Sequence, residues 1–183
     1  MTAEFIVISG GPCSGKTTII DELTAAGHTT IPEAATELIE DPPFDNLRSD
    51  PREFQRRVLT RQLENERRVL KSVGTGETVF LDRGIGDGFG YLLYHEFEPF
   101  EELIEAWPQA RERSRCVLFF DSRPDYQAAS HRSETPEEAR RIHEILLADY
   151  RSRHDRVIRI PWLPVEERLV AVLEESGLKK RSG

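Results

Sequence analysis

The sequence predicts a doubly wound α/β fold, in which helices cover both faces of a parallel sheet. Three observations support this prediction. Short apolar runs alternate along the chain with longer segments of helical periodicity. Most of these runs contain few polar residues, which is typical of strands buried on both faces. The glycine-rich stretch "GGPCSGKTT" separates the first apolar run from the first helical segment.

The chain contains five candidate strands, separated by candidate helices. The strands are expected at residues 5–9, 28–31, 78–81, 116–120 and 157–160. The helices are expected at residues 16–26, 34–40, 52–72, 88–97, 100–112, 136–153 and 165–175. This succession favours parallel strands joined by helical crossovers.

Two helix boundaries have a local cause in the sequence. Asp41-Pro42-Pro43 should end a helix, because proline lacks an amide donor and restricts the residue before it. Thr135 is a candidate N-cap followed by Pro136, and the acidic residues after them favour the positive end of a helix. The C-terminal residues 179–183 are expected to form a frayed tail.

Composition narrows the class of protein. The 183 residues are enough for one domain, and the net charge of −8 argues against a general nucleic-acid binder. Two cysteines far apart fit a reducing compartment, and no apolar stretch approaches the roughly 20 residues that span a bilayer. No secretory signal is visible, so we expect no transmembrane segment and a cytoplasmic localisation. Nothing in the sequence indicates an oligomeric state.

The glycine-rich stretch satisfies the phosphate-loop pattern G-x-x-x-x-G-K-T, between a strand and a helix. Its backbone amides could wrap a phosphate group, with Lys16 on the β- and γ-phosphates and the Thr17 hydroxyl on Mg²⁺. The alternative is an ordinary glycine turn before a helix. The predicted nucleotide-binding residues are Gly10, Gly11, Pro12, Cys13, Ser14, Gly15, Lys16, Thr17 and Thr18.

Asp82 and Arg83 follow the third predicted strand, in "VFLDRGIGDGFGYLLY". Asp82 could hold Mg²⁺ directly or through water, and Arg83 could contact the transferred phosphoryl group or the acceptor. The alternative is a capped turn without a catalytic role.

Glu33 follows the second predicted strand, in "TTIPEAATELI". Its carboxylate could accept the proton of an attacking hydroxyl group. It could equally be an acidic residue that stabilises the first turn of a helix.

Several arginines lie in and near the segment "HRSE", and Arg132 is our candidate catalytic residue among them. An arginine on a closing flap would neutralise charge in the transition state of phosphoryl transfer. A solvated, charged helix is the alternative.

The segments "ISGGPCSGKTT", "IPEAATELI", "FLDRGIGDGFGY", "HRSE" and "IPWLPVEERL" together resemble the small predicted AAA-type ATPases with a kinase-like P-loop core. That group is similar to the nicotinamide riboside kinase domain of NadR-type proteins and, more distantly, to deoxynucleoside and nucleoside-monophosphate kinases. The resemblance covers nearly the whole chain. Its most specific part is the pattern D-R-G-x-x-D-x-x-x-Y from Asp82 to Tyr91.

The resemblance implies a three-layer P-loop NTPase fold, with a five-stranded parallel sheet in the order 2-3-1-4-5 and helices on both faces. It implies one domain over residues 1–178, with a lid at about residues 122–140. Glu33, Asp82, Arg83 and Asp87 would face the acceptor, and Arg132 would lie on the lid. Relatives often carry an aspartate three residues before that arginine, where this chain has Ala129.

The resulting hypothesis is an Mg²⁺-dependent phosphotransferase that uses ATP, or GTP, and a small nucleoside-, nucleotide- or vitamin-like acceptor. Lys16, Glu33, Asp82, Arg83 and Arg132 would be catalytic, and Glu33, Arg83 and Asp87 would bind the acceptor. Thr17 and Asp82 would hold the metal. The alternative hypothesis is a nucleotide-binding regulatory module that hydrolyses slowly or not at all, which the substitution at Ala129 would favour.

Overall fold

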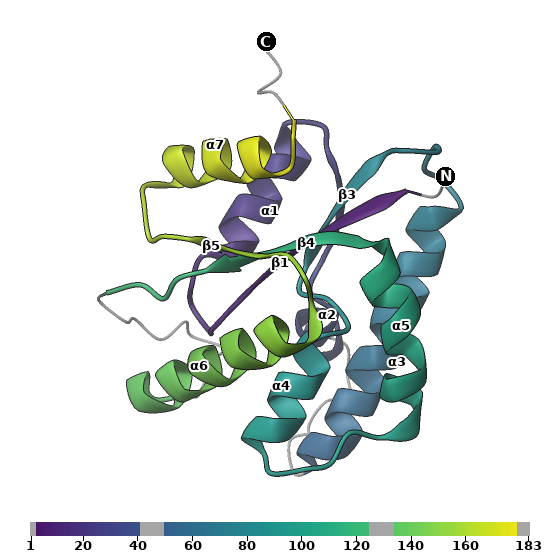
Figure 1. Cartoon of the computed structure of the whole chain (residues 1–183), viewed down its shortest axis with the longest axis vertical. Helices are drawn as coiled ribbons and strands as arrows, with labels where there is room; N and C mark the ends of the chain where they lie inside the picture. The colour runs from purple at the N-terminus through teal and green to yellow at the C-terminus, as the bar shows by residue number, and fades with distance from the viewer. Residues whose placement is uncertain (1–2, 41–49, 125–133, 179–183) are drawn as a thin grey trace.

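The chain forms three layers, with a parallel sheet between two layers of helices (Figure 1). The computed structural model describes residues 3–40, 50–124 and 134–178. The strand order is β2-β3-β1-β4-β5, and each neighbouring pair is parallel. The predicted order is therefore confirmed. The strands are β1 (Glu4–Gly10), β2 (Thr29–Ile31), β3 (Thr78–Asp82), β4 (Ser114–Phe120) and β5 (Val157–Ile160).

Helices cover both faces of the sheet. Figure 1 shows α1 (Lys16–Ala25) and α7 (Val165–Glu175) together on one side, where they bury a shared apolar cluster with the strands. On the other side lie α3 (Pro51–Leu70), α4 (Asp87–Tyr94), α5 (Glu101–Arg113) and α6 (Pro136–Arg153). The short helix α2 (Ala34–Glu40) packs against α3.

Strand β1 contributes side chains to two apolar clusters, one on each face of the sheet. Its side chains alternate between the faces of the sheet. Ile6 and Ile8 pack towards α1 and α7, whereas Phe5 and Val7 pack in the cluster that includes residues of α6. A third cluster joins α3, α4 and α5 through residues such as Leu59.

The position of β1 decides where the site lies. Strand β1 lies between β3 and β4, so the sheet extends to both sides of it. Ligands of open α/β sheets bind at the carboxyl ends of the strands, at such a switch point. Both Gly10, which ends β1, and Asp82, which ends β3, stand at this edge.

Most predicted elements agree with the structure within two residues at each end. The predicted N-cap of α6 is confirmed, because the Thr135 hydroxyl accepts from the Glu138 amide at 3.2 Å and the Glu138 carboxylate accepts from the Thr135 amide at 2.7 Å. The helix predicted at 88–97 was too long. Helix α4 ends at Tyr94, because Glu96 has a φ of 61° and the Phe97 amide turns back to the Leu92 carbonyl.

Several predictions fall outside the described residues. These are the Asp41-Pro42-Pro43 helix stop, Ala129, Arg132 and the tail at 179–183, together with the middle of the predicted lid. The single domain and the cytoplasmic localisation stay predictions. Within the ranges that the structure describes, no helix is both long and apolar enough to span a bilayer.

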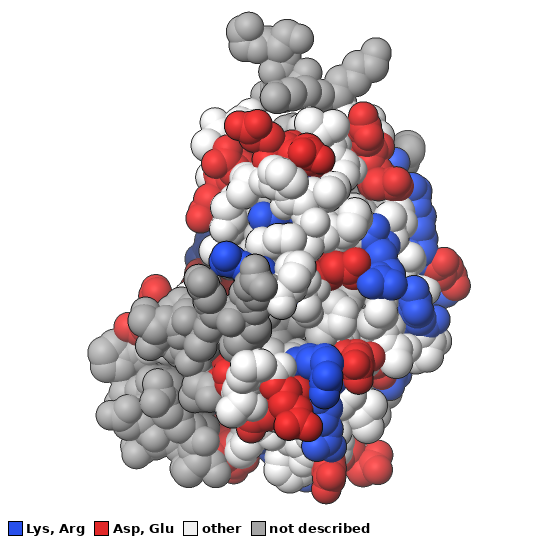
Figure 2. Space-filling model, turned by 90° about the vertical axis from the view of Figure 1, so that its left-hand side faces the viewer, with Lys and Arg blue, Asp and Glu red and all other residues white. Residues whose placement is uncertain are grey.

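The surface carries both signs of charge. On the face drawn in Figure 2, the basic side chains of the described residues are interspersed with acidic ones. This part of the face does not form the continuous basic surface on which binding to a nucleic-acid backbone depends.

Candidate active site

The phosphate loop connects β1 to α1 with a backbone that requires glycine at two positions. Gly10 has a φ of 143° and Gly15 a φ of 77°, in the region that side chains rarely adopt. A Cβ atom on Gly10 would also lie 2.6 Å from the carbonyl oxygen of Phe120. The loop is therefore held between β1, β4 and the first turn of α1.

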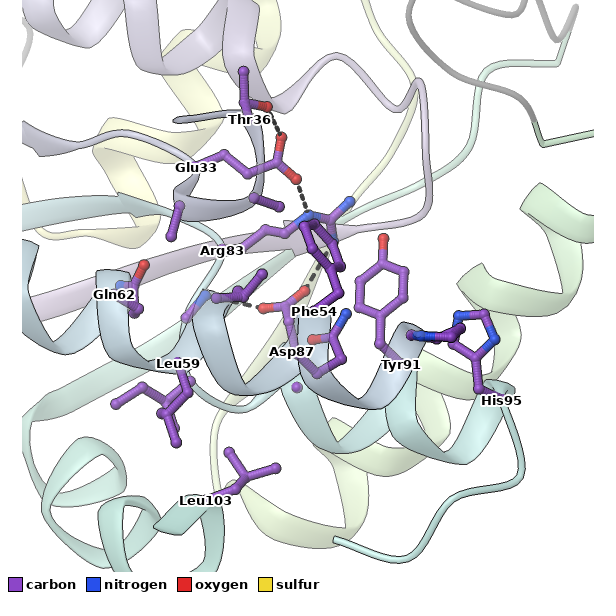
Figure 3. Close-up of a pocket in the computed structure, with 18 of the residues that line it drawn as sticks. Glu33, Thr36, Phe54, Leu59, Gln62, Arg83, Asp87, Tyr91, His95 and Leu103 are labelled. Atoms are coloured by element: carbon purple, nitrogen blue, oxygen red, sulfur yellow. Dashed lines mark hydrogen bonds and ion pairs between the residues drawn. The ribbon is translucent and has the colours of Figure 1, made fainter. Parts of the chain in front are cut away.

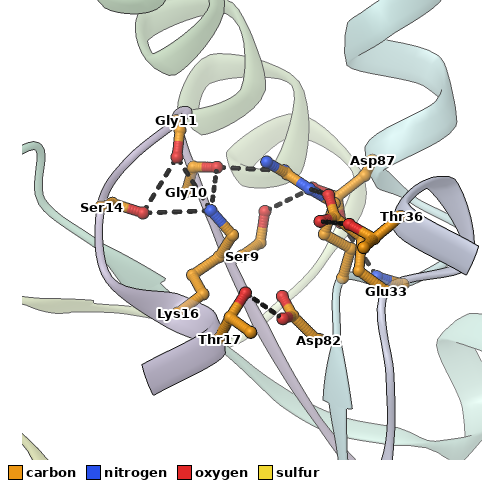
Figure 4. Close-up of polar contacts among 12 residues, drawn as sticks. Ser9, Gly10, Gly11, Ser14, Lys16, Thr17, Glu33, Thr36, Asp82 and Asp87 are labelled. Carbon is orange, nitrogen blue, oxygen red and sulfur yellow. Dashed lines mark hydrogen bonds and ion pairs between the residues drawn. The ribbon is translucent and has the colours of Figure 1, made fainter. Parts of the chain in front are cut away.

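Lys16 is the first residue of α1, and its side chain folds back over the loop. Its ammonium group donates to the Gly10 carbonyl at 3.2 Å, the Gly11 carbonyl at 2.8 Å and the Ser14 hydroxyl at 3.1 Å (Figure 4). Only 3% of Lys16 is exposed. A buried ammonium group at the start of a helix is suited to binding an anion.

Thr17 and Asp82 meet across the loop. The Thr17 hydroxyl donates to Asp82 Oδ2 at 2.7 Å, whereas Oδ1, which is also buried, accepts no hydrogen bond from a described residue. Burial and the nearby Glu33 carboxylate raise the pKa of Asp82 to about 6. The lack of a hydrogen bond to Oδ1 and the burial of a negative charge are both unfavourable. A cation bound to the carboxylate would reduce both free-energy costs.

These two residues fit the way in which proteins hold Mg²⁺. The described residues contain no cluster of three or more His, Cys, Asp or Glu side chains that could hold a metal ion. Mg²⁺ is commonly bound through one or two protein oxygens, with water and phosphate oxygens completing the coordination. A hydroxyl beside a buried carboxylate matches that pattern.

Arg83 joins the loop to the predicted acceptor side. Its Nε donates to Glu33 Oε1 at 2.6 Å, and its Nη1 donates to the Gly10 carbonyl at 3.0 Å. Its Nη2 is buried and has no hydrogen-bond partner among the described residues. Arg83 also has a φ of 67°, a conformation that is costly for a residue with a side chain. The surrounding contacts therefore hold Arg83 in a strained position next to the loop.

Asp87 supports Arg83 from the start of α4. Its Oδ1 accepts from Arg83 Nη1 at 2.9 Å and from the Ser9 hydroxyl at 2.7 Å. Its Oδ2 accepts from the Gly84 amide at 3.0 Å and from the Tyr150 hydroxyl at 2.6 Å. The four donors come from the protein itself, so the contacts of Asp87 are those of a residue that orients Arg83.

Glu33 precedes α2 and is also held by two donors. Besides Arg83, the Thr36 hydroxyl donates to its Oε2 at 2.7 Å. Glu33 is 8% exposed and lines a cavity of about 360 Å³. Each carboxylate oxygen has two lone pairs, so a carboxylate can accept more than one hydrogen bond at each oxygen.

The cavity lies between α2, α3 and α4, beside the polar residues described above. Figure 3 shows Glu33, Arg83 and Asp87 linked by hydrogen bonds, with Phe54 and Tyr91 near them. The walls also include Gln55, Leu59, Gln62, His95, Phe100 and Leu103. Such a mixture of apolar walls and few polar groups is typical of small-molecule sites.

Sequence reasoning missed these glutamines and aromatic side chains. A seven-residue spacing places Gln55 and Gln62 on the same face of a helix, which was the available signal. Their position beside Glu33 and Arg83 depends on how α3 packs.

Arg168 of α7 is a basic residue at the phosphate loop, in addition to Lys16. Sequence reasoning missed it. It is 3% exposed, and its Nη1 donates to the Ser14 carbonyl at 3.1 Å. Its guanidinium lies 4.5 Å from the centre of the Trp162 ring. No described carboxylate forms an ion pair with it, so its charge adds to the positive potential behind the loop.

The structure thus brings Lys16, Thr17, Glu33, Asp82, Arg83 and Asp87 together at one edge of the sheet. Arg132 lies outside the described residues. Of the remaining loop residues, Cys13 is a half-buried free cysteine and Thr18 is exposed.

Known structures share this fold. The crystal structure of NadR protein in complex with NR has a TM-score of 0.71 and 21% identity, with 99% of this chain and 54% of that chain covered. Thymidylate kinase from Ehrlichia chaffeensis has a TM-score of 0.63 and 14% identity, over 96% of this chain and 100% of that chain. Deoxyadenosine kinase from M. mycoides, with products dCMP and dCDP bound, has a TM-score of 0.63 and 14% identity, over 94% of this chain and 98% of that chain.

This chain spans about half the length of the NadR protein. A comparison with curated protein sequences found no match. The sequence family described as AAA domain matches residues 5–168, which is most of the chain and includes both the phosphate loop and the Asp82 segment. The chain therefore belongs to this family of P-loop, nucleotide-binding AAA domains, and its fold resembles that of small-molecule kinases.

Proposed function

We propose that this chain is an Mg²⁺-dependent phosphotransferase that moves the γ-phosphoryl group of ATP to a hydroxyl group of a small molecule. The observation that carries the proposal is the double contact of Arg83, which bonds to the phosphate loop through Gly10 and to the cavity wall through Glu33. A donor site and an acceptor cavity that share one buried guanidinium are suited to direct transfer between them.

The donor would be held by the loop amides and Lys16. These groups would contact phosphate oxygens and not the base, so GTP would fit them as well as ATP. Thr17 and Asp82 would hold Mg²⁺, which, when bound, neutralises the charge that develops on the phosphate groups.

Transfer would use Glu33 and Arg83. The acceptor oxygen forms a bond to the γ-phosphorus while the bond from that phosphorus to the bridging oxygen of ADP breaks. The hydroxyl proton passes to the Glu33 carboxylate. The Nη2 of Arg83, which has no partner among the described residues, would donate to the transferred group. Asp87 would position Arg83, and Arg132 of the predicted lid would supply a further guanidinium.

The proposal is tested by measuring ADP formation from Mg·ATP in the presence of nucleosides, nucleotides and vitamin precursors. We expect at least one acceptor to stimulate ADP release and to gain a phosphoryl group, detected by mass spectrometry. Glu33→Gln should lower turnover with that acceptor by roughly 10²- to 10⁴-fold. Asp82→Ala should also abolish stimulation, whereas Glu40→Gln, at an exposed position of α2, should not.

Tight ATP binding without stimulation by any acceptor would contradict the proposal. That result would favour the nucleotide-binding regulatory module instead.

A further inference from the structure

We propose that His143 of α6 belongs to the nucleotide site, and that its imidazole takes up a proton when the phosphate groups of a nucleotide bind to the loop. The phosphate-loop motif does not include this histidine, which lies more than 120 residues further along the chain. Nucleotide binding is the only part of the proposed function on which this inference depends, and phosphoryl transfer is not needed for it.

His143 lies directly against the phosphate loop. A Cβ atom on Gly11 would lie 2.8 Å from the Cβ of His143, 3.3 Å from its Nδ1 and 3.3 Å from the Ala139 carbonyl oxygen. Residues 139 and 143 are about one helical turn apart, so they share one face of α6. This face of α6 therefore packs on the loop at Gly11, where a larger residue would push the two apart.

Two contacts orient the imidazole of His143. Its Nδ1 lies 3.0 Å from the Ser122 Oγ, in the segment that follows β4. The ring of Phe119, on β4, meets the imidazole edge-on, with 5.1 Å between the ring centres. A serine hydroxyl can donate to a neutral imidazole or accept from a protonated one. The hydrogen bond to Ser122 is therefore compatible with both protonation states.

The charges of the protein itself disfavour a proton on His143. Burial lowers the pKa of its imidazole below the usual 6.5. The carboxylates of Asp121 and Glu144 raise this pKa, whereas the positive charges of Arg159 and Lys16 lower it. Asp121 is itself paired, because its Oδ1 lies 2.9 Å from Arg159 Nε and 2.8 Å from Arg159 Nη2. The protein alone therefore keeps His143 mainly neutral at pH 7.

Phosphate groups on the loop would reverse this balance. Lys16 donates to the Gly11 carbonyl at 2.8 Å (Figure 4), so Lys16 and His143 both lie next to the same loop residue. Phosphates held by Lys16 would bring negative charge close to the imidazole, and an opposite charge nearby raises the pKa of a histidine. Because the linkage is reciprocal, a proton on His143 should tighten nucleotide binding by the same factor.

The direct test is an NMR titration of the histidine side chains of the wild-type protein, with the signals of His143 assigned through the backbone. We expect the pKa of His143 to lie below 6.5 in the free protein. It should rise by about one unit when Mg²⁺ and a non-hydrolysable ATP analogue are added, which corresponds to about tenfold tighter binding to the protonated form. This measurement needs no variant, so it stands even if substitution of His143 destabilises the fold.

The second test measures the affinity for the same analogue by calorimetry between about pH 8 and about pH 6. Wild-type affinity, relative to that of His143→Asn, should rise about fivefold over this range, because only the wild type takes up the proton. Asparagine keeps a polar group within reach of Ser122 but does not titrate. His28→Asn is the matched control, since His28 directly precedes β2, at the opposite edge of the sheet, and it should behave as the wild type does.

Asp82 and the analogue also titrate in this range, but they do so in all three proteins and cancel in the comparison. A role in packing alone would lower the affinity of His143→Asn by the same factor at every pH. That result, or a pKa of His143 that does not change with the analogue, would overturn the inference and leave the proposed function intact. Proton uptake by His143 without phosphoryl transfer to any acceptor would instead contradict the proposed function alone.

Discussion

The proposed donor side and the proposed acceptor side of this site are built in different ways. Most of the donor side is one continuous stretch from Gly10 to Thr18, stabilised by hydrogen bonds among its own residues, with Asp82 and Arg168 added from elsewhere in the chain. The acceptor side combines Glu33 before α2, Arg83 after β3 and the glutamines of α3. Glu33 and Arg83 are 50 residues apart in the sequence and are joined by a hydrogen bond. The donor side is therefore a local motif, whereas the acceptor side exists only in the folded chain.

Because the two sides share few residues, they should respond separately to mutation. Donor-side variants should change the affinity for nucleotide, and acceptor-side variants should change the affinity for the acceptor or the rate of transfer. Three variants, of Lys16, Arg168 and Ser9, test this separation, and a variant of Asp82 tests the electrostatics of the predicted metal site; they follow from the largest expected effect to the smallest.

Lys16→Ala should weaken ATP binding by at least about 100-fold, because charge-assisted hydrogen bonds contribute about 1.5–3 kcal/mol each. Binding of an acceptor should change little. Calorimetric titration with ATP measures the effect, and Lys71→Ala, at an exposed position, serves as the control. Undiminished ATP affinity in Lys16→Ala would contradict the prediction that this loop binds the phosphate groups of ATP.

Asp82→Asn should stabilise the protein at pH 7 in the absence of nucleotide and Mg²⁺. The pKa of Asp82 is about 6 in the folded state, above its usual 3.8, because the carboxylate is buried and lies near Glu33. The folded state thus binds the proton more tightly, and ionisation of Asp82 lowers stability as pH rises from about 4 to about 6. The variant avoids this loss and should gain roughly 1–3 kcal/mol at pH 7.

Urea unfolding at several pH values measures this difference. The advantage of Asp82→Asn should shrink towards pH 4, where the wild-type carboxyl group is protonated in the folded state. An advantage that does not depend on pH would contradict the explanation. Asp21→Asn, on the exposed side of α1, is the matched control and should show no such trend.

Arg168→Leu should weaken ATP binding about tenfold and leave the affinity for the acceptor unchanged. The substitution removes a buried positive charge and the hydrogen bond to the Ser14 carbonyl, which together contribute about 1–2 kcal/mol. Fluorescence titration with a nucleotide analogue measures the loss, with Arg151→Leu as an exposed control. Equal losses for nucleotide and acceptor would show that Arg168 supports the whole fold and not the loop.

Ser9→Ala is expected to have the smallest effect and to test the separation most sharply. Ser9 lies on β1, next to the phosphate loop, but its hydroxyl donates to Asp87, which orients Arg83. Turnover should fall about threefold while ATP affinity stays the same, since a single hydrogen bond contributes about 0.5–1.5 kcal/mol. A weaker affinity for ATP with normal turnover would place Ser9 on the donor side.

The order of the elements was predictable from the sequence because each depends on short-range physics. Apolar runs such as residues 116–120 read as buried strands, and the Thr135 cap with Glu138 marked the start of α6. The end of α4 was not predictable in this way. Glu96 adopts a left-handed backbone conformation, and no glycine at this position indicates that turn in the sequence. The turn allows the Phe97 amide to donate to the Leu92 carbonyl.

The same distinction holds for the site. Lys16, Thr17 and the glycines follow from a motif in which neighbouring residues surround one phosphate group. Asp82 and Arg83 were predicted from their place after a strand, but the link from Arg83 to Gly10 and Glu33 was not. Arg168 was missed altogether, because it lies more than 150 residues from the loop that it contacts.

By itself, the sequence determined that this chain has a phosphate loop on an α/β fold, since strand, loop and helix are local choices of backbone and burial. Only the tertiary structure decided the acceptor side. The packing of α3 and α4 against β3 sets which side chains face the cavity, and Arg83 and Asp87 become buried partners only when β1 and β3 pair. Those contacts depend on distances between segments, which no local pattern of residues encodes.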